Sequence, residues 1–139
     1  MNQSSMANCV CIIMALYIML LPSVIATSMT HSSNSSTINE ERQALLQSRW
    51  WIDYLNISDH CEWDGIACIE DGSVGEIYLT GWNIPPSEEL RRLQNLNVTA
   101  FPNLLVLHLY GMGLTGSIPK EISTLTNLAS LDLTNNNLQ

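Results

Sequence analysis

Cys61 and Cys68 are the residues of this 139-residue chain whose side chains are best suited to covalent chemistry. Two such thiols can form a disulfide, remain free or bind a metal ion. A structural metal site normally needs further ligands such as a second cysteine pair, and the mature chain expected below has none. A disulfide is therefore predicted, and closing so short a loop would stabilise the fold by about 2.5 kcal/mol in the chain-entropy model.

The N-terminal segment decides the compartment in which these thiols fold. Residues 1–39 carry no charged side chain, and an apolar run of 13 residues, Cys9–Leu21, is followed by Pro22 and by small residues at Val24 and Ala26 that suit cleavage after Ala26. The run is short for a bilayer span, so we predict a signal peptide over residues 1–26, which places the chain in the secretory pathway. Because no Lys or Arg precedes the run, an uncleaved membrane anchor is the alternative. Residues 27–37, rich in Ser, Thr and Asn, are expected to form a flexible leader.

Catalytic and metal-binding chemistry is only weakly indicated. His108 has the side chain of a general base, but no nucleophile or oxyanion arrangement accompanies it in the sequence. Acidic residues gather between Asp53 and Glu76 without the spacing of a calcium loop, so a solvated acidic surface is the preferred interpretation. A net charge of −8 disfavours nucleic acid as a partner. We therefore expect no enzyme, no cofactor and no metal site.

A tandem repeat provides the scaffold. The pattern L-x-x-L-x-L-x-x-x-x-L begins at Leu104 and again, 24 residues later, at Leu128. This is the pattern of a leucine-rich repeat, in which each unit contributes one short strand and buries its leucines against neighbouring units. Asn136 falls where a side-chain amide can bond the backbone of the turn. Leu114–Pro119 matches the motif L-x-G-x-I-P of the plant-specific subclass, and a helical turn over Lys120–Leu125 is expected to follow.

A degenerate copy of the repeat precedes these two and starts at Val74, 30 residues before Leu104. The extra length predicts an α-helix with Ser87 as its N-cap. The repeats are thus assigned to residues 74–103 (degenerate first), 104–127 (second) and 128–139 (incomplete third). Six apolar residues at the C-terminal end of the array should face an unfilled position, so the isolated chain is expected to associate through that end. They are Ile122, Leu125, Leu128, Leu131, Leu133 and Leu138.

Side chains that alternate with the inward leucines should point to the concave face of the predicted sheet. Tyr78, His108 and Asp132 occupy equivalent positions in the three repeats and are expected to form one lateral row, with Tyr110 nearby. We predict that these four residues contact a partner, which would be a peptide, protein or glycan ligand, with a co-receptor as a further candidate.

An amphipathic helix is predicted ahead of the first repeat. Thr37–Glu40 fits a capping box, and the carboxylates of Glu40 and Glu41 suit the positive end of a helix dipole. Trp50 and Trp51 at the end of this helix are interpreted as core residues rather than as a carbohydrate platform. The predicted buried stripe consists of Ala44, Leu45, Ser48 and Trp51.

This helix and the segment Cys61–Cys68, with its spacing C-x-W-x-G-I-x-C, resemble the N-terminal cap of plant leucine-rich-repeat receptors. With L-x-G-x-I-P downstream, residues 38–139 resemble the start of the extracellular part of a plant receptor-like kinase or receptor-like protein. The resemblance implies an α/β solenoid of 24-residue plant-type repeats with a helical, disulfide-closed cap over residues 38–73. It also implies that Cys61 and Cys68 are bonded, with Trp63 packed beneath them.

Three sequons follow the predicted signal peptide, at Asn34, Asn56 and Asn97, and none has Pro in its middle position. In a secreted chain each is a plausible acceptor of an N-linked glycan. We predict glycans at Asn56 and Asn97, with Asn34 as a further candidate.

The leading functional interpretation is an extracellular recognition module, the ligand- or co-receptor-binding start of a plant receptor-like serine/threonine kinase at the cell surface. Kinase motifs such as H-R-D and D-F-G are absent here, so kinase activity would belong to a longer parent protein. Membrane association would then require a further C-terminal segment or an uncleaved signal. The alternative is a short secreted protein of the apoplast that acts as a decoy or as an inhibitor of a cell-wall-degrading enzyme.

Overall fold

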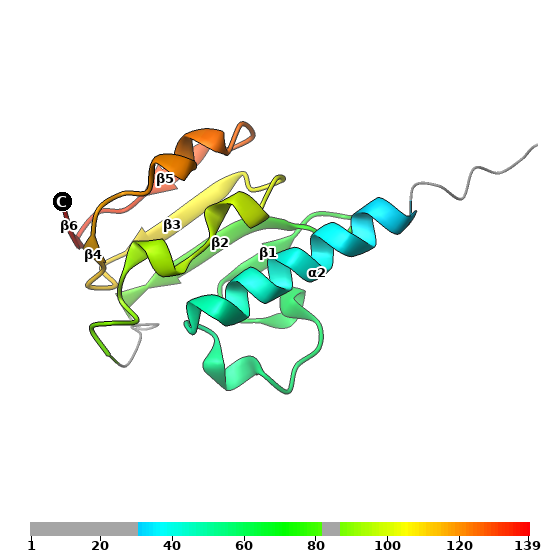
Figure 1. Cartoon of the computed structure of the whole chain (residues 1–139), viewed down its shortest axis with the longest axis horizontal. Coiled ribbons are helices and arrows are strands. Elements are labelled where there is room, and N and C mark those ends of the chain that lie inside the picture. Colours follow the sequence, from blue (N-terminus) through cyan, green and yellow to red (C-terminus); the bar gives the residue numbers. More distant parts are fainter. Residues whose placement is uncertain (1–30, 82–86) are drawn as a thin grey trace, which may run out of the picture.

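The computed structural model describes residues 31–81 and 87–139, which form a four-stranded sheet with helices packed against it (Figure 1). Helix α2 (His31–Ser48) leads into the 3-10 helices η1 (Ile52–Tyr54) and η2 (His60–Glu62). The predicted signal peptide lies outside the described residues. The later elements are β1 (Ile66–Cys68), β2 (Val74–Thr80), η4 (Leu93–Asn95), η5 (Val98–Ala100), β3 (Val106–Tyr110), β4 (Thr115–Gly116), η6 (Lys120–Thr124), β5 (Ser130–Asp132) and β6 (Asn137–Leu138).

The strand order places the repeats side by side. The sheet runs β1-β2-β3-β5, with β1 antiparallel to β2 and with β2, β3 and β5 parallel. Ile77 pairs with Leu107, and Leu107 pairs with Leu131. Positions that the sequence pattern equates are therefore direct neighbours across the sheet.

One face of this sheet forms the core. Side chains alternate along each strand, and the inward residues Ile77, Leu79, Leu107 and Leu109 are at most 2% exposed. In Figure 1, α2 and the helical segments that link the strands lie in front of the sheet, and their apolar residues join the same buried cluster. Each fully buried leucine contributes about 1.5–3 kcal/mol, so the repeat is held mainly by these apolar contacts.

The turn after β3 leads into a second, two-stranded sheet that the sequence pattern did not predict. Strand β4 pairs in parallel with β6, and Gly116 lies opposite Leu138. Gly116 has φ +85°, and a Cβ atom there would lie 2.7 Å from the side-chain oxygen of Gln94. The left-handed φ therefore favours glycine at this position, whereas the Gln94 amide is the end of a flexible side chain and could move aside. Pro119 is extended and leads into η6, as predicted.

Asn136 joins two successive repeats, and its predicted bond to the turn backbone is confirmed. Its Nδ2 donates to Leu109 O (2.6 Å) and Leu133 O (2.9 Å), and its Oδ1 accepts from the backbone N–H of Leu114 (2.9 Å). Met112, which occupies the equivalent place one repeat earlier, is fully buried. Met112 thus contributes packing to the turn after β3, and Asn136 of the following repeat bonds the backbone of that turn.

Replacing Asn136 with alanine is expected to lower the free energy of unfolding by about 2 kcal/mol, because a backbone N–H and two carbonyls lose their partner. Asn137→Ala is the matched control, since the Asn137 side chain is exposed. It should change the stability by less than about 0.5 kcal/mol. Urea unfolding of the two variants measures the difference, and equal losses would contradict the role given to Asn136.

The first helix begins earlier than the sequence suggests. The capping box places the N-cap at Thr37, whereas α2 begins at His31, so that prediction was wrong. Residues 31–37 of the predicted flexible leader are therefore helical. The buried stripe stabilises the C-terminal part of the helix. Each residue added before it gains a backbone hydrogen bond without a further cost of helix nucleation. Ser36 Oγ also donates to Glu40 Oε1 across one turn (3.1 Å).

The buried stripe itself is confirmed, because Ala44, Leu45, Ser48 and Trp51 are all at most 4% exposed. The helix ends at Ser48, however, and Arg49 follows with φ +63°. The indole N–H of Trp51 donates to Asp64 O (2.9 Å), and that of Trp50 donates to Leu90 O (2.6 Å). Both tryptophans are therefore structural, and each satisfies its one polar atom.

The segment after Ser87 is not the predicted α-helix. It forms a turn, in which Leu90 N–H donates to Ser87 O, and then continues into η4. Thr115 N–H donates to Arg91 O (2.8 Å), so the backbone here pairs with the next repeat instead of continuing a helix. Leu93 and Leu96 are nevertheless buried, as their spacing predicts.

The last strand is less covered than its neighbours. Leu131 in β5 is 45% exposed, whereas its partner Leu107 is fully buried. Leu128, Leu133, Leu138 and Ile122 are partly buried. Leu125 is the exception, because it closes η6 and packs into the core with 8% exposure; its predicted exposure was wrong. Association through this surface stays a prediction.

Candidate ligand-binding face

The opposite face of the sheet carries the predicted binding residues. Tyr78 is 55% and Tyr110 46% exposed, and His108 and Asp132 are half-buried. Tyr78 pairs with His108, and His108 pairs with Asp132, so the predicted lateral row exists. We call this surface the open face. It consists of Glu76, Tyr78, Thr80, Val106, His108, Tyr110, Ser130, Asp132 and Thr134.

Polar side chains on the open face hold one another in place. The rings of Tyr78 and His108 lie 5.7 Å apart, and His108 Nε2 is 2.7 Å from Ser130 Oγ. Asp132 Oδ1 accepts from Thr134 N–H (2.9 Å) and Thr134 Oγ1 (2.6 Å). The hydrogen bonds from the Thr134 side chain and backbone hold the pKa of Asp132 below its ordinary value of 3.8. Asp132 is therefore a carboxylate at neutral pH.

A hollow lies where β2 and β3 end on this face. Its lining residues are Tyr78, Thr80, Gly81, Tyr110 and Gly111. A Cβ atom at Gly81 would lie 3.0 Å from Gly111 O, so the two glycines allow the turns to approach closely. The hydroxyl of Tyr110 accepts from Asn135 Nδ2 (2.5 Å), which orients the ring. Two exposed phenol rings thus flank a glycine floor that a ligand side chain can contact.

The contact between His108 and Ser130 is a feature that sequence reasoning missed. The strand register could have predicted this contact. When Asp132 pairs with His108 across β3 and β5, Ser130 lies diagonally opposite His108. A serine and a histidine at this distance are two parts of a nucleophilic triad. Asp132, the acidic residue of the row, accepts hydrogen bonds from the backbone N–H and the hydroxyl of Thr134. The backbone N–H groups of the interior strands already bond neighbouring strands and do not form an oxyanion hole. The contact between His108 and Ser130 therefore fits a role in orienting the two side chains better than a role in acyl transfer.

The helix α2 is joined to the strands by a buried polar cluster. Glu41 is fully buried, and its carboxylate accepts from Ser73 Oγ (2.5 Å) and Val74 N–H (2.9 Å). Asn103 Nδ2 donates to the same Ser73 Oγ (3.0 Å). Burial raises the pKa of Glu41 above its ordinary value of 4.5. Glu41 therefore lies inside the fold rather than at the helix N-terminus, where the sequence analysis placed it.

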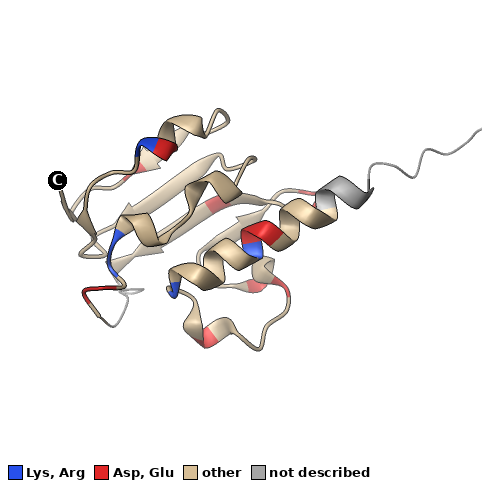
Figure 2. Ribbon diagram, viewed as in Figure 1, with Lys and Arg blue, Asp and Glu red and all other residues tan. Residues whose placement is uncertain are grey.

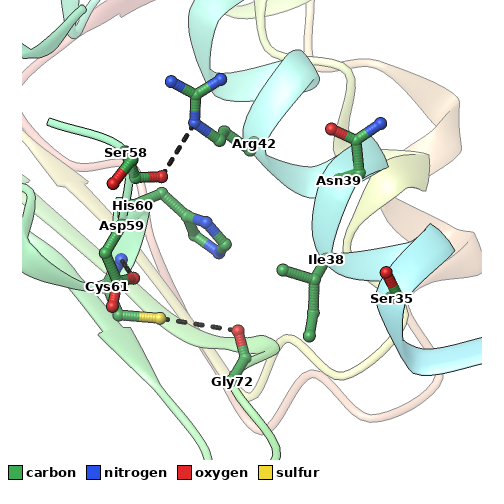
Figure 3. A pocket seen from close by; sticks show the side chains of 9 residues that line it. All are labelled: Ser35, Ile38, Asn39, Arg42, Ser58, Asp59, His60, Cys61 and Gly72. Atoms are coloured by element: carbon green, nitrogen blue, oxygen red, sulfur yellow. Dashed lines mark hydrogen bonds between the residues drawn. The ribbon is translucent and has the colours of Figure 1, made fainter. Parts of the chain in front are cut away.

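His60 lies beside this cluster and is 2% exposed. Its Nε2 is 3.8 Å from Glu41 Oε2 and has no hydrogen-bond partner among the described residues. Burial lowers the pKa of His60 below 6.5. Figure 3 shows its ring in a second pocket, between α2 and the cysteine loop, which Ile38, Asn39 and Arg42 enter from the helix. Arg42 Nε donates to Ser58 O (3.1 Å) across it.

The cysteine loop has the predicted bond. Cys61 and Cys68 form a disulfide with their Cα atoms 5.5 Å apart. Trp63 lies between them in sequence and is 2% exposed, with its indole N–H donating to Ile57 O (3.1 Å). The guanidinium carbon of Arg42 lies 5.7 Å from the Trp63 ring centroid. The disulfide, Trp63 and α2 thus form one packed unit.

Removing the disulfide by the double change Cys61→Ala and Cys68→Ala is expected to lower the free energy of unfolding by about 2.5 kcal/mol, because the unfolded chain regains the entropy of the open loop. Guanidinium melts of the oxidised chain and the variant measure the loss. Melts of the unmodified chain with a reductant provide the control and should show a similar loss. A variant as stable as the oxidised chain would exclude a stabilising role.

The three sequons differ in their settings. Asn56 is exposed and follows η1, and Asn97 is exposed between η4 and η5. The hydroxyl of Thr99, the third residue of its sequon, donates to Asn97 Oδ1 (2.8 Å). Asn34 lies within α2, a regular helix, and not in a loop. Glycosylation at all three positions stays a prediction.

Comparisons with known proteins give a consistent relationship. No protein-family model matches the chain. Over 117 residues it is 36% identical to the leucine-rich repeat receptor-like serine/threonine-protein kinase RGI4 of Arabidopsis thaliana, covering 73% of this chain and 10% of the relative. It is 35% identical to RGI3 of the same plant, covering 68% and 9%. Polygalacturonase inhibitor 1 of rice is 32% identical, covering 60% and 24%.

Among solved structures, the ectodomain of the Arabidopsis receptor kinase HAESA, determined with a peptide hormone, is 23% identical with a TM-score of 0.49. That match covers 75% of this chain and 17% of the other. Among the described residues, no helix is long and apolar enough to cross a bilayer. This chain spans between about a tenth and a quarter of the curated relatives named above. The matches fall in the leucine-rich-repeat part of the kinases and not in their kinase domain, and with the repeats described above they show that the chain belongs to the plant leucine-rich-repeat receptor-like kinase family, as a relative of its N-terminal region.

Proposed function

We propose that this chain is the N-terminal recognition part of a cell-surface receptor, and that its open face contacts a peptide or protein ligand or a co-receptor. The observation that carries the proposal is the row of Tyr78, His108 and Asp132. The parallel register brings these residues together on the open face, which is opposite the face that forms the core. The similarity to receptor-like kinases supports the same assignment. Kinase activity would belong to a longer protein that includes this chain.

The finer architecture is part of the proposal. Repeats of the 24-residue plant type extend from the cap as a solenoid, and residues 38–73 form the cap that covers its first unit. The disulfide and the buried Trp63 support this role for the cap. We further propose that residues 1–26 are removed as a signal peptide, that Asn56 and Asn97 carry glycans, and that the mature chain lies at the plasma membrane or in the apoplast.

A binding comparison tests the function. The chain secreted from plant cells is immobilised, and partners from a cell-wall peptide and protein fraction are identified and titrated. The triple variant Tyr78→Ala, His108→Ala and Tyr110→Ala should lose those partners. The control Ile52→Ala, Asp53→Ala and Leu55→Ala changes three exposed residues around η1 and should keep them. Circular dichroism establishes that both variants fold. Partners that bind all three proteins equally would refute the proposal.

The similarity to a polygalacturonase inhibitor favours a second candidate, a secreted inhibitor of a wall-degrading enzyme. It is distinguished by adding the chain to a fungal polygalacturonase and measuring the release of reducing sugar. Inhibition at stoichiometric concentration supports the second candidate, and full activity at a large excess of chain excludes it for that enzyme.

A further inference from the structure

We propose that the open face binds a basic peptide segment, with one Arg or Lys side chain stacked in the hollow between Tyr78 and Tyr110 and a neighbouring cationic group paired with Asp132. This inference rests on the proposed function and adds the chemistry of the partner. It follows from the distribution of charge, the aromatic hollow and the free oxygen of one carboxylate.

Basic side chains lie outside the open face, whereas acidic side chains occur on it. The open face carries the carboxylates of Glu76 and Asp132 and no Lys or Arg. Figure 2 shows the basic residues on α2, on the segments that link the strands and on η6, away from the strands. The five basic residues of the chain are Arg42, Arg49, Arg91, Arg92 and Lys120. The net charge of the whole chain is −8, so its electrostatic field attracts a cationic partner to the open face and repels an acidic one.

The hollow suits a cation held by aromatic rings. Tyr78 and Tyr110 keep about half of their surface exposed, and Gly81 and Gly111 leave room between them. An Arg or Lys head group is attracted to an aromatic face within about 6 Å of the ring centroid. The chain already makes such a contact internally, since Arg42 lies 5.7 Å from the Trp63 ring centroid.

Asp132 provides the counter-charge for a neighbouring basic residue. Both hydrogen bonds from Thr134 go to Oδ1, so Oδ2 has no partner among the described residues and remains available to a guanidinium or ammonium group. Asp132 is on β5, the strand next to the β3 strand of Tyr110. It pairs with His108, which is two residues before Tyr110. With strands about 4.8 Å apart and about 3.3 Å per residue, the two backbone positions are roughly 8 Å apart. Basic residues close together in one peptide span that distance.

Tetra-arginine with blocked ends is the probe, and tetra-citrulline is its uncharged isostere. Titrations with the full chain at low salt should show tetra-arginine binding about tenfold more tightly than tetra-citrulline. Asp132→Asn keeps an oxygen for Thr134 but removes the charge, and it should weaken tetra-arginine binding about tenfold. Tyr110→Leu should also weaken it, by about threefold or more. Asp53→Asn, which removes one exposed carboxylate from η1, should change it less than twofold.

Equal effects of Asp132→Asn and Asp53→Asn would overturn the inference, because binding would then reflect net charge alone. Equal binding of tetra-arginine and tetra-citrulline would overturn it as well. The proposed function fails separately. If the triple variant loses its natural partners while Asp132→Asn leaves the affinity for tetra-arginine unchanged, the open face is a binding surface of different chemistry. If Asp132→Asn weakens tetra-arginine binding but natural partners bind the triple variant as tightly as the unmodified chain, the open face binds cations and is not the recognition surface. The inference about cations then stands and the proposed function fails.

Discussion

Replacement of Trp63 by alanine is expected to lower the free energy of unfolding by about 4 kcal/mol, the largest effect that we predict for a single substitution. The ring is 2% exposed and packs with Tyr54 (centroids 6.1 Å apart), edge-on with His60 (6.3 Å) and beneath Arg42. Alanine leaves a cavity at the point where the cysteine loop meets α2, and Ile57 O loses its donor. Urea melts followed by far-UV circular dichroism measure the loss.

Two further variants keep this prediction testable. Trp63→Phe keeps a buried aromatic ring but removes the indole N–H and part of the ring volume, so its loss should be smaller, about 1–2 kcal/mol. It remains measurable even if the alanine variant does not fold. Ile52→Ala removes an apolar side chain that is 50% exposed and should cost less than about 0.5 kcal/mol. A Trp63→Ala variant no less stable than Ile52→Ala would show that the cap does not depend on this ring.

Replacement of Glu41 by alanine is expected to lower the free energy of unfolding by about 3 kcal/mol. Ser73 Oγ–H and Val74 N–H lose their shared acceptor inside the core, and each unsatisfied buried donor costs about 1–3 kcal/mol. Glu40→Ala is the matched control, because this neighbour on the same helix is exposed and, within residues 31–81 and 87–139, its side chain bonds only Ser36. Its loss should stay below about 0.5 kcal/mol. Equal losses for Glu40→Ala and Glu41→Ala would refute the structural role of the buried carboxyl.

The same carboxyl gives stability a characteristic pH dependence. Burial raises the pKa of Glu41 in the folded chain, so the folded state binds the proton more tightly than the unfolded state. Stability should therefore fall as the pH rises from about 4.5 through the raised pKa. Burial lowers the pKa of His60, so its contribution is lost as the pH falls from about 6.5 through the lowered pKa. Asp71 near Glu41, and Asp59 and Arg42 near His60, modulate these shifts.

Melts between pH 4 and 8 of the unmodified chain, Glu41→Gln and His60→Gln separate the two contributions. Relative to the unmodified chain, Glu41→Gln should lose the decline on the alkaline side, and His60→Gln should lose the decline on the acidic side. Parallel stability curves for all three proteins would show that neither group titrates inside the fold.

The repeats were predictable because their signal is periodic. The leucines recur at fixed spacing, and burying them on one face leaves a single parallel register, so the row Tyr78, His108 and Asp132 followed from the sequence. The segment after Ser87 was not predictable in the same way. Its apolar spacing fits a helix, but its backbone pairs with Thr115, and such a partner is invisible to a local pattern.

The polar contacts were harder to predict, because each depends on a partner distant in sequence. Glu41 reads as a helix N-terminal residue until the true start of α2 is known, and its partner Ser73 is 32 residues away. The contact between His108 and Ser130 required the strand register. One signal was available, since Asn103 and Asn127 are 24 residues apart and each bonds back to the preceding unit, at Ser73 Oγ and Pro102 O.

These backward hydrogen bonds, with those of Asn136, give the array a direction of assembly. Asn136 completes the turn that contains Leu109 and Leu114, so this turn is finished only when the following unit is in place. On a ribosome, α2 and β1 would emerge before β2 and β3, and the turn after β3 would be closed only when Asn136 has been made. An insertion of half a unit between Leu109 and Asn136 would move the Asn136 amide away from the Leu109 carbonyl and the Leu114 N–H that it bonds.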